Sequence, residues 1–343
     1  MFESITARKK PNWFLRIAAA LVMAAIVWGC ASLWRMTEMP LRSYKGPLTP
    51  LTATQADLAG RLSAHVAHLA TTIRERNVRF EGSLPQTVDY LRSQLAQMGY
   101  KVSEQAYTID GQPESNLETQ LDGRDPVSGL VIVGAHYDSV EGTVGANDNA
   151  SGVAATLELA RLLQKSKLRR TVRFVFFVNE EPPFFQTEQM GSLVYARKLR
   201  RDGVKLSAMI SLETIGYYSE APGSQKYPPG LGLLYPDRGN FIGFVGNPAS
   251  RDLVRRAVRS FRESTSFPSE GVAAPENLPG VGWSDHWSFW QQGYPAIMVT
   301  DTAPFRYPYY HTRLDTPDMI DFERMARVVD GMKNVIASLA DEP

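Results

Sequence analysis

Residues 130–138 read LVIVGAHYD, an apolar run that turns polar at its end. A short apolar run of this kind indicates a buried strand. His136 and Asp138 lie two positions apart, so their side chains point to the same side of an extended chain. A metal-bound histidine usually donates its second N–H to a carboxylate, and this pair has that form, although a surface ion pair is the alternative. The stretch therefore predicts a buried strand with a polar site at its carboxyl end.

The same alternation of strand and helix continues on both sides of this stretch. Strands are expected at 101–107, 130–133, 172–178, 208–212, 241–245 and 296–300. Helices are expected at 52–76, 84–98, 150–163, 188–201, 250–263 and 322–339. Thr54 is the expected N-cap of the first of these helices. Strands that alternate with helices predict an α/β fold, with a largely parallel sheet covered by helices on both faces.

The composition excludes several classes of protein. The chain has 343 residues, 43% hydrophobic and 21% charged, which excludes a disordered protein. Its net charge of +1 argues against a protein that binds nucleic acid through phosphates. With one cysteine it makes no internal disulfide and no cysteine-based zinc site. Chemistry that depends on histidine draws on five residues only.

The N-terminal region predicts a membrane segment. Residues 17–34 carry no charge, close to the about 20 residues that span a bilayer. Basic residues precede it at positions 8, 9, 10 and 16, so the positive-inside rule places the N-terminus in the cytoplasm. The expected organisation is a cytoplasmic tail (1–16), a transmembrane signal anchor (17–34), a linker (35–51) and a catalytic domain (52–343). The domain is then extracytoplasmic, or periplasmic in a bacterium.

Three interpretations of this segment stay open. It is an uncleaved single-pass signal anchor, a lipoprotein signal or an ordinary cleaved signal. Cys30 follows Gly29 at the end of the apolar run, as a lipidated cysteine does, but Trp28 is bulky for that pattern. In all three the rest of the chain is exported.

Acidic residues follow the other apolar strands. Glu180 and Glu181 come directly after the strand at 172–178, and Glu213 follows the strand at 208–212. Adjacent carboxylates after a buried strand are costly unless a positive charge lies between them, and a metal supplies that charge. Asp148 lies in a turn of small residues, where capping of the next helix is the alternative.

Together these residues suit a metal centre, namely His136, Asp148, Glu181, Glu213 and His311. If one carboxylate bridges, each of two metals receives one histidine, one terminal carboxylate and the bridge, with a position open for water. Nitrogen and oxygen ligands without sulfur suit Zn²⁺, and Co²⁺ or Mn²⁺ remain alternatives. Glu180 is left over as a general base.

Two segments, 221–240 and 264–282, are rich in proline and glycine and match no element. Long loops of this kind are often functional, so they are expected to form the rim of a binding site. A surface cover over the core is the alternative.

Five motifs in order resemble the M28 family of zinc peptidases, which includes leucyl-type aminopeptidases and glutamate carboxypeptidases. They are GAHYDS (134–139), GANDNASG (145–152), NEE (179–181), SDH (284–286) and YHT (310–312) with DT at 315–316. The resemblance covers about 84–340. It implies a three-layer α/β/α sandwich of the zinc-peptidase type, with a mixed, mostly parallel central sheet.

The resemblance also implies a role for each site residue. His136 and Glu213 hold one zinc, Glu181 and His311 hold the other, and Asp148 bridges the two. Glu180 is the general base, and Asp138 orients His136. The resemblance further implies a cis peptide bond between Asp148 and Asn149.

The chain departs from the family pattern at a few positions. Glu213 stands where the family often has Asp, and Val281 stands where some members have a tyrosine that stabilises the oxyanion. Tyr310 is the residue expected to replace that tyrosine. His286 is expected to be structural, and the two histidines at 65 and 68 are expected to be solvated.

The expected function is hydrolysis of N-terminal amino acids from peptides. Trp283, Phe305 and Tyr310 are expected to contact the substrate. The alternatives are a single-zinc glutaminyl cyclase, a carboxypeptidase that uses Arg306 or Arg313, and a non-catalytic binding protein with the same fold. The side-chain preference and the oligomeric state do not follow from the sequence.

Overall fold

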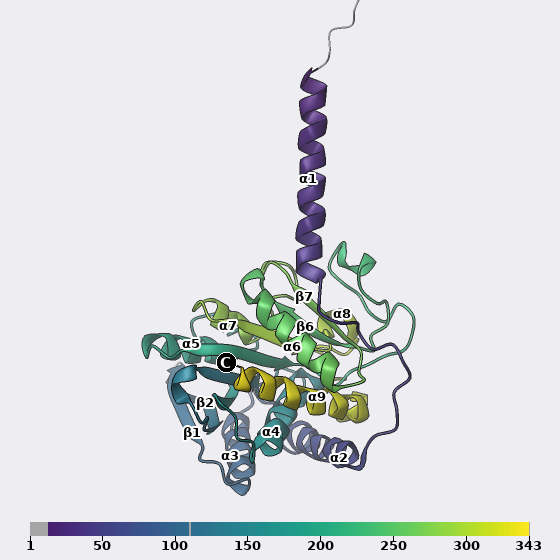
Figure 1. The fold of residues 1–343 in the computed structure, drawn as a ribbon. Coiled ribbons are helices and arrows are strands. Elements are labelled where there is room, and N and C mark those ends of the chain that lie inside the picture. Colours follow the sequence, from purple (N-terminus) through teal and green to yellow (C-terminus); the bar gives the residue numbers. More distant parts are fainter. Residues whose placement is uncertain (1–12, 110, 343) are drawn as a thin grey trace, which may run out of the picture.

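The computed structural model describes residues 13–109 and 111–342 (Figure 1). Residues 1–12, which hold most of the expected cytoplasmic tail, lie outside the described residues. The fold is centred on an eight-stranded sheet in the order β1-β2-β4-β3-β5-β8-β6-β7. The strands are β1 (Ser103–Ile109), β2 (Gln112–Leu121), β3 (Leu130–His136), β4 (Thr171–Phe177), β5 (Leu206–Glu213), β6 (Ile242–Gly246), β7 (Ser269–Ala273) and β8 (Ala296–Thr300).

Helices cover both faces of this sheet, so the predicted three-layer α/β/α architecture is confirmed. The helices of the domain are α2 (Ala53–Ala67), α3 (Ser83–Gln97), α4 (Gly152–Leu163), α5 (Gly191–Arg201), α6 (Arg251–Ser264), α7 (His286–Trp290), α8 (Ala303–Arg306) and α9 (Phe322–Asp341). Short 3₁₀ or π segments add η1 (His68–Ile73), η2 (Pro126–Ser128), η3 (Ala146–Ser151), η4 (Leu231–Leu233), η5 (Pro248–Ser250) and η6 (Pro317–Met319).

The alternation of side chains along β3 explains the three layers. Val131 and Val133 belong to the larger core, which α2, α3, α4, α6 and α9 complete. Ile132 points the other way, into a smaller core completed by α5 and α7. Every residue of β3 is buried, as expected of a central strand covered on both faces.

The central strands place the site. Strands β4, β3, β5 and β8 are mutually parallel, while β1, β2 and β6 run antiparallel to a neighbour. The sheet is therefore mixed, as predicted. The last residue of β3, His136, pairs with Phe177 at the end of β4. Glu213 ends β5 beside Thr300 of β8. Because parallel strands end at one edge, the residues that follow them meet there.

The structure corrects several sequence expectations. Strand β2 was not predicted, and β7 lies inside the expected loop 264–282. The first helix of the domain is capped by Thr52, not Thr54, because Thr52 and Gln55 form a reciprocal capping box. The helix expected at 188–201 begins at Gly191, after a series of turns.

The N-terminal helix α1 (Trp13–Thr37) projects from the domain (Figure 1). Its segment Arg16–Thr37 is long and apolar enough to cross a membrane and is not buried against the described chain. A signal sequence has the same length and composition. The expected linker is packed on the domain: Pro40 is buried, and Ser43 Oγ accepts a hydrogen bond from Ser269 N at 3.0 Å.

Candidate metal centre

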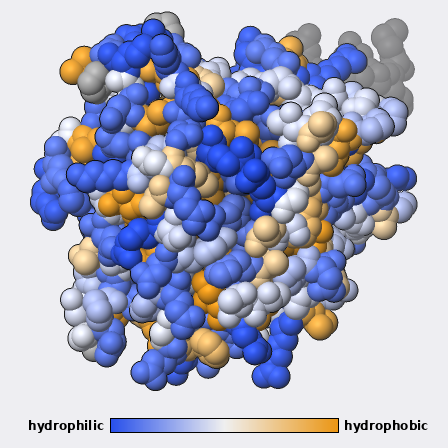
Figure 2. All heavy atoms as spheres, turned by 90° about the horizontal axis from the view of Figure 1, so that it is seen from below, coloured by the Kyte–Doolittle hydropathy of each residue, from blue (hydrophilic) through white to orange (hydrophobic). Residues whose placement is uncertain are grey.

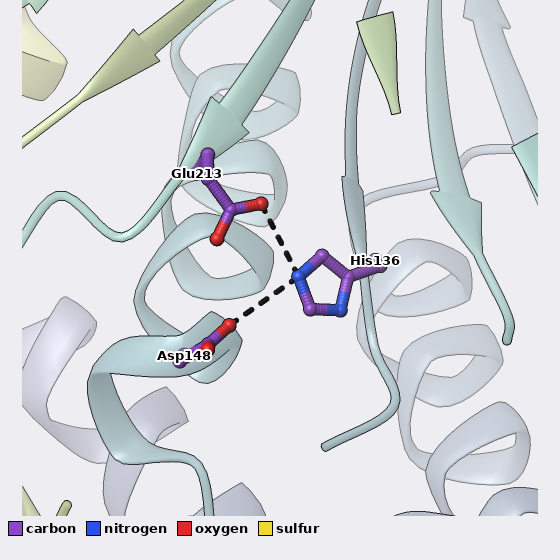
Figure 3. Close-up of side chains that lie close together, drawn as sticks. All are labelled: His136, Asp148 and Glu213. Carbon is purple, nitrogen blue, oxygen red and sulfur yellow. Dashed lines mark ion pairs between the residues drawn. The ribbon is translucent and has the colours of Figure 1, made fainter. Parts of the chain in front are cut away.

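Five predicted ligands converge at the carboxyl edge of the central strands. His136 ends β3 and Glu213 ends β5, while Glu181 follows β4. Asp148 lies in η3 at the start of α4, and His311 comes from the loop between α8 and η6. Figure 3 shows His136, Asp148 and Glu213 pointing toward one another from these elements. Residues up to 175 positions apart in the sequence thus form one cluster, because 311 − 136 = 175.

Asp148 lies between two groups of ligands. His136 Nε2 is 3.2 Å from Glu213 Oε2 and 3.4 Å from Asp148 Oδ1. On the other side, His311 Nε2 is 3.0 Å from Asp148 Oδ2 and 3.3 Å from Glu181 Oε2. In each group one atom per residue lies within 4.8 Å of the others. The two oxygens of Asp148 therefore face two separate His and Glu pairs.

The atoms of the cluster fit a metal. His136 Nε2 and Glu181 Oε1 are buried and have no hydrogen-bond partner of good geometry among the described residues. Buried polar atoms are normally paired, so such atoms require an explanation. A cation between the carboxylates and imidazoles pairs them. Imidazole nitrogen and carboxylate oxygen are donors that zinc accepts.

The charges at the site point the same way. Burial raises the pKa of Glu181 to about 7, and the nearby Asp148 adds to this effect. Burial also raises the pKa of Glu180 well above its ordinary value, as do Glu213 and Glu181, against the lowering effect of His136. Burial raises the pKa of Asp285 to about 7 as well. A concentration of buried carboxylates that resist ionisation is what a bound cation relieves.

Asp138 connects the two halves of the predicted site. Its Oδ1 accepts a hydrogen bond from Glu180 N at 3.1 Å, and its Oδ2 accepts one from Glu181 N at 3.0 Å. Its Oδ1 also lies 3.4 Å from His136 Nδ1. The buried carboxylate of Asp138 therefore positions the turn that carries both glutamates. The same carboxylate also faces Nδ1 of His136, the ring nitrogen that points away from the other candidate ligands.

Asp315 supports the site and was quoted only as part of a motif in the sequence. It is fully buried and accepts hydrogen bonds from the backbone N–H of Asn147 at 2.8 Å and of Asp148 at 3.1 Å. The hydroxyl of Tyr307 donates to it at 2.8 Å. The loop that carries His311 is thereby joined to the turn that carries Asp148.

Arg76 is a second supporting residue, and nothing in the sequence identified it. It is fully buried, and its Nε donates to the carbonyl of Tyr137 at 2.8 Å. Its Nη1 donates to Val144 O at 2.6 Å and its Nη2 to Gly145 O at 2.9 Å. These carbonyls belong to the segment between His136 and Asp148, so Arg76 fixes the path of that segment. Burial lowers the pKa of Arg76 to about 10, so it stays charged at neutral pH.

The backbone beside the ligands is unusual. Asn179, Thr214 and His311 have φ values of 59°, 44° and 56° without being glycine. This left-handed region is sparsely populated by such residues, and it clusters at functional sites. The peptide bond between Asp148 and Asn149 is cis, as the resemblance implies.

A mainly apolar pocket opens next to the ligands. Glu213 of the cluster and Tyr310, the neighbour of His311, line this pocket together with Trp283 and Phe305. Both loop segments, 221–240 and 264–282, contribute to its wall. The ring of Tyr310 stacks on His311 with centroids 3.9 Å apart. The three expected substrate contacts are therefore in one pocket beside the candidate metal ligands.

Other expectations have mixed outcomes. The prediction that His65 is solvated was wrong: it is buried and contacts Tyr90 at 2.6 Å and Glu158 at 3.2 Å. His286 lies in the interior, where its Nε2 is 2.7 Å from Val281 O, in agreement with a structural role. Arg306 is buried, and its Nε donates to Gln225 at 2.7 Å, so it does not present a free guanidinium to a substrate carboxylate.

Comparison with known proteins identifies the family. The model of peptidase family M28 matches residues 116–336. An uncharacterised Escherichia coli protein, YfbL, is 41% identical over 282 residues, which cover 79% of this chain and 85% of YfbL. A probable leucine aminopeptidase of Arthroderma otae is 27% identical over 225 residues, or 60% of this chain and 53% of that protein. The chain thus spans about half the length of that aminopeptidase.

Solved structures share the fold at lower identity. A zinc aminopeptidase from Bacillus subtilis has a TM-score of 0.67 and 15% identity, over 83% of this chain and 95% of that chain. A glutaminyl cyclase from Fimbriiglobus ruber has a TM-score of 0.61 and 19% identity, over 86% of this chain and 98% of that chain. At these identities the likeness concerns the fold.

Proposed function

The chain belongs to peptidase family M28, and from this premise we propose that it is an exopeptidase that removes N-terminal amino acids from peptides at a dinuclear zinc site. The observation that carries the proposal is the position of Asp148 between the two His and Glu pairs. The similarity to a probable leucine aminopeptidase supports the choice of the N-terminal end.

We assign the ligands from the distances within the two groups. His136 and Glu213 would hold one zinc, and Glu181 and His311 would hold the other. Asp148, which lies between the two pairs, would be shared by both. Co²⁺ and Mn²⁺ share a preference for these donors and are alternatives for the native metal. Glu213 provides a longer side chain than aspartate, and Ser284 Oγ holds its Oε2 at 2.7 Å.

Glu180 is the proposed general base. A bound zinc would supply Lewis acidity, which can lower the pKa of a water to about 7. Glu180 is 6% exposed, and its Oε2 lies 3.8 Å from His136 Nε2, next to both ligand groups. Its carboxylate accepts the proton of the attacking water and passes it to the leaving amine. Asp138 holds the backbone of Glu180 in place for both transfers.

The apolar pocket is the proposed site for the substrate side chain. Trp283 and Phe305 provide its aromatic wall. Burial raises the pKa of Tyr310, as do the charges of Asp148 and Glu181, so its hydroxyl remains a hydrogen-bond donor at neutral pH. We assign Tyr310 to stabilise the oxyanion that develops on the scissile carbonyl.

We further propose that α1 anchors the enzyme in a membrane, with the domain on the extracytoplasmic side. Supporting observations are the length and composition of Arg16–Thr37 and its lack of burial against the described chain. The basic residues that precede the helix set the orientation.

Replacement of Glu180 by Gln in the full chain, purified in detergent, tests the proposal. We expect two zinc ions per chain by elemental analysis in both proteins, and a fall in turnover of aminoacyl anilides of about 10²- to 10⁴-fold in the variant. Glu188→Gln is the matched control, because the Glu188 side chain is 80% exposed. It should retain full turnover.

Each other outcome has a defined meaning. Retained turnover in Glu180→Gln contradicts the assignment of the base. Cleavage of peptides with a blocked N-terminus contradicts the aminopeptidase. One zinc with cyclisation of N-terminal glutamine identifies a glutaminyl cyclase. A chain without bound metal identifies a non-catalytic binding protein.

A further inference from the structure

The loop at 227–236 exposes apolar side chains that the domain itself does not use. It reads YPPGLGLLYP and contains no charged residue. Leu233 is 92% exposed, the most exposed large apolar side chain in the described part of the chain, and Leu234 is 47% exposed. Contiguous exposed apolar surface marks interaction sites, and these two adjacent leucines are a candidate for one.

Contacts within the loop and with the domain hold the loop 227–236 in a defined conformation. The rings of Tyr227 and Tyr235 stack with centroids 5.7 Å apart. The Tyr227 hydroxyl donates to Pro236 O at 2.5 Å, which closes the loop on itself. The Tyr235 hydroxyl donates to Gly271 O at 2.7 Å, which holds the loop against β7. The two leucines are therefore presented outward by a fixed scaffold.

The C-terminal end of α1 packs against the same strand, β7. Helix α1 contacts β7, and Met39 packs closely over Gly271. Arg262 donates to the carbonyls of Pro40 and Leu41, both at 3.0 Å. In Figure 1 the loop around η4 rises beside the lower end of α1, on the side of the domain from which α1 departs. Because the chain after α1 is fixed to the domain, this side faces whatever membrane α1 enters.

Charge on this side fits the surface of an anionic bilayer. Five basic residues around the end of α1 and the loop are exposed, namely Arg35, Arg42, Lys45, Lys226 and Arg238, and they outnumber the two exposed acidic residues there, Glu220 and Asp237. Basic residues next to exposed apolar ones are typical of surfaces that bind anionic lipid. The nearby Glu38 is paired with Arg251 and Arg255. The face opposite α1 is mostly hydrophilic, with apolar residues in scattered patches between the polar ones (Figure 2).

We propose that the loop 227–236 is a second membrane contact, which inserts Leu233 and Leu234 into the interfacial layer of the anionic bilayer that α1 crosses. The proposal rests on the membrane anchor proposed above and goes beyond it. Tyr227, Leu231 and Tyr235 of the same loop line the apolar pocket. The loop that contacts the lipid therefore also forms part of the pocket wall.

Site-directed fluorescence in the full chain tests this contact. Leu233→Cys in a Cys30→Ser background carries an environment-sensitive dye, in nanodiscs of phosphatidylcholine and phosphatidylglycerol. Part of the lipid carries a nitroxide quencher high in the acyl chain. Val127→Cys is the matched control, because Val127 is apolar, 84% exposed and near the start of β3, at the opposite end of the strand from His136. We expect quenching at position 233 to exceed that at 127 at least about twofold.

A third label, on the native Cys30 of the parent chain, separates the two proposals. Cys30 lies within α1 and is exposed there. Quenching at 30 without quenching at 233 overturns the loop contact and leaves the anchor in place. Quenching at neither position overturns both. Quenching at 233 alone shows lipid at the loop but refutes the spanning helix on which the proposal rests, and so overturns the proposal as stated. A blue shift at 233 without quenching shows burial against protein and overturns the lipid contact.

Discussion

Replacement of Asp138 by Asn tests whether the metal site depends on the hydrogen bonds behind it. In the parent chain both carboxylate oxygens of Asp138 accept backbone N–H groups, at 3.1 Å from Glu180 and 3.0 Å from Glu181. Asparagine offers one oxygen and one NH₂ group, so one of the two N–H groups faces another donor. The substitution also removes the negative charge 3.4 Å from His136 Nδ1.

The size of the effect follows from these contacts. A buried donor left without an acceptor costs about 1–3 kcal/mol, and we expect the free energy of unfolding of the metal-free chain to fall by this amount. Loss of the carboxylate behind a metal-bound histidine lowers metal affinity about 10- to 100-fold. This factor corresponds to about 1.4–2.7 kcal/mol of zinc binding.

Zinc competition with a fluorescent chelator measures the affinity, and denaturant titration after chelation measures the stability. Asp252→Asn is the matched control, because the side chain of Asp252 is 93% exposed. It should change neither quantity. If Asp138→Asn binds zinc as tightly as the parent chain, the reasoning that Asp138 positions this site is refuted.

Three further predictions concern acid stability, the loop support and the pocket. Burial lowers the pKa of His286 to about 4, so between about pH 6.5 and 4 the unfolded chain binds a proton that the folded chain does not. The free energy of unfolding should therefore fall by on the order of 3 kcal/mol as the pH is lowered over this range. In denaturant titrations, His286→Gln should remove this part of the pH dependence. Arg76→Met leaves several buried carbonyls without a hydrogen-bond donor and should lower the free energy of unfolding by at least about 3 kcal/mol. The stability of Arg76→Lys should be intermediate. In steady-state kinetics, Phe305→Ala should raise KM for leucyl anilides about tenfold or more, whereas Tyr310→Phe should lower kcat about 10²- to 10³-fold.

Each of these has an outcome that contradicts it. If the free energy of unfolding of His286→Gln falls with pH as much as that of the parent chain, groups other than His286 cause the fall. Equal stability of Arg76→Met and the parent chain contradicts the role of Arg76 in supporting the loop. A fall in kcat in Phe305→Ala, or a rise in KM alone in Tyr310→Phe, reverses the roles assigned to the two aromatic residues.

The central part of the fold was predictable because its strands are apolar on both faces. Strand β3 is buried throughout, and the sequence reads as an apolar run at the same place. Strand β2 was missed because it contains buried polar residues. Asn116 bonds to Val178 N and Gly191 O, partners that lie far along the chain. Such partners satisfy a polar side chain only after folding, so the sequence alone does not show them.

The candidate ligands were predictable for a different reason: four of the five end or follow a strand or lie at the start of a helix, so their positions have a local signal, whereas His311 lies in a loop and was identified only with the other motifs. The residues that hold the candidate ligands in place have no such local signal. Arg76 follows η1 at the end of the first helical segment of the domain and acts through backbone carbonyls about 60 to 70 residues away. His65 was expected to be solvated because it lies on the first helix of the domain, but it is enclosed by Tyr90 and Glu158 from two other helices. Tertiary packing decides both cases.

The loop 227–236 has two sides with different surroundings, since Leu231 lines the pocket and Leu233 faces outward. If contact with a bilayer shifts this loop, the wall of the pocket shifts with it, and binding at one side is then thermodynamically linked to binding at the other. The two effects are then equal: the factor by which a bilayer changes the affinity for a peptide is also the factor by which a bound peptide changes the affinity of the loop for the bilayer. An inhibitor that fills the pocket then serves as a reporter of membrane attachment, and the lipid composition becomes a variable of the enzyme's affinity for its substrates.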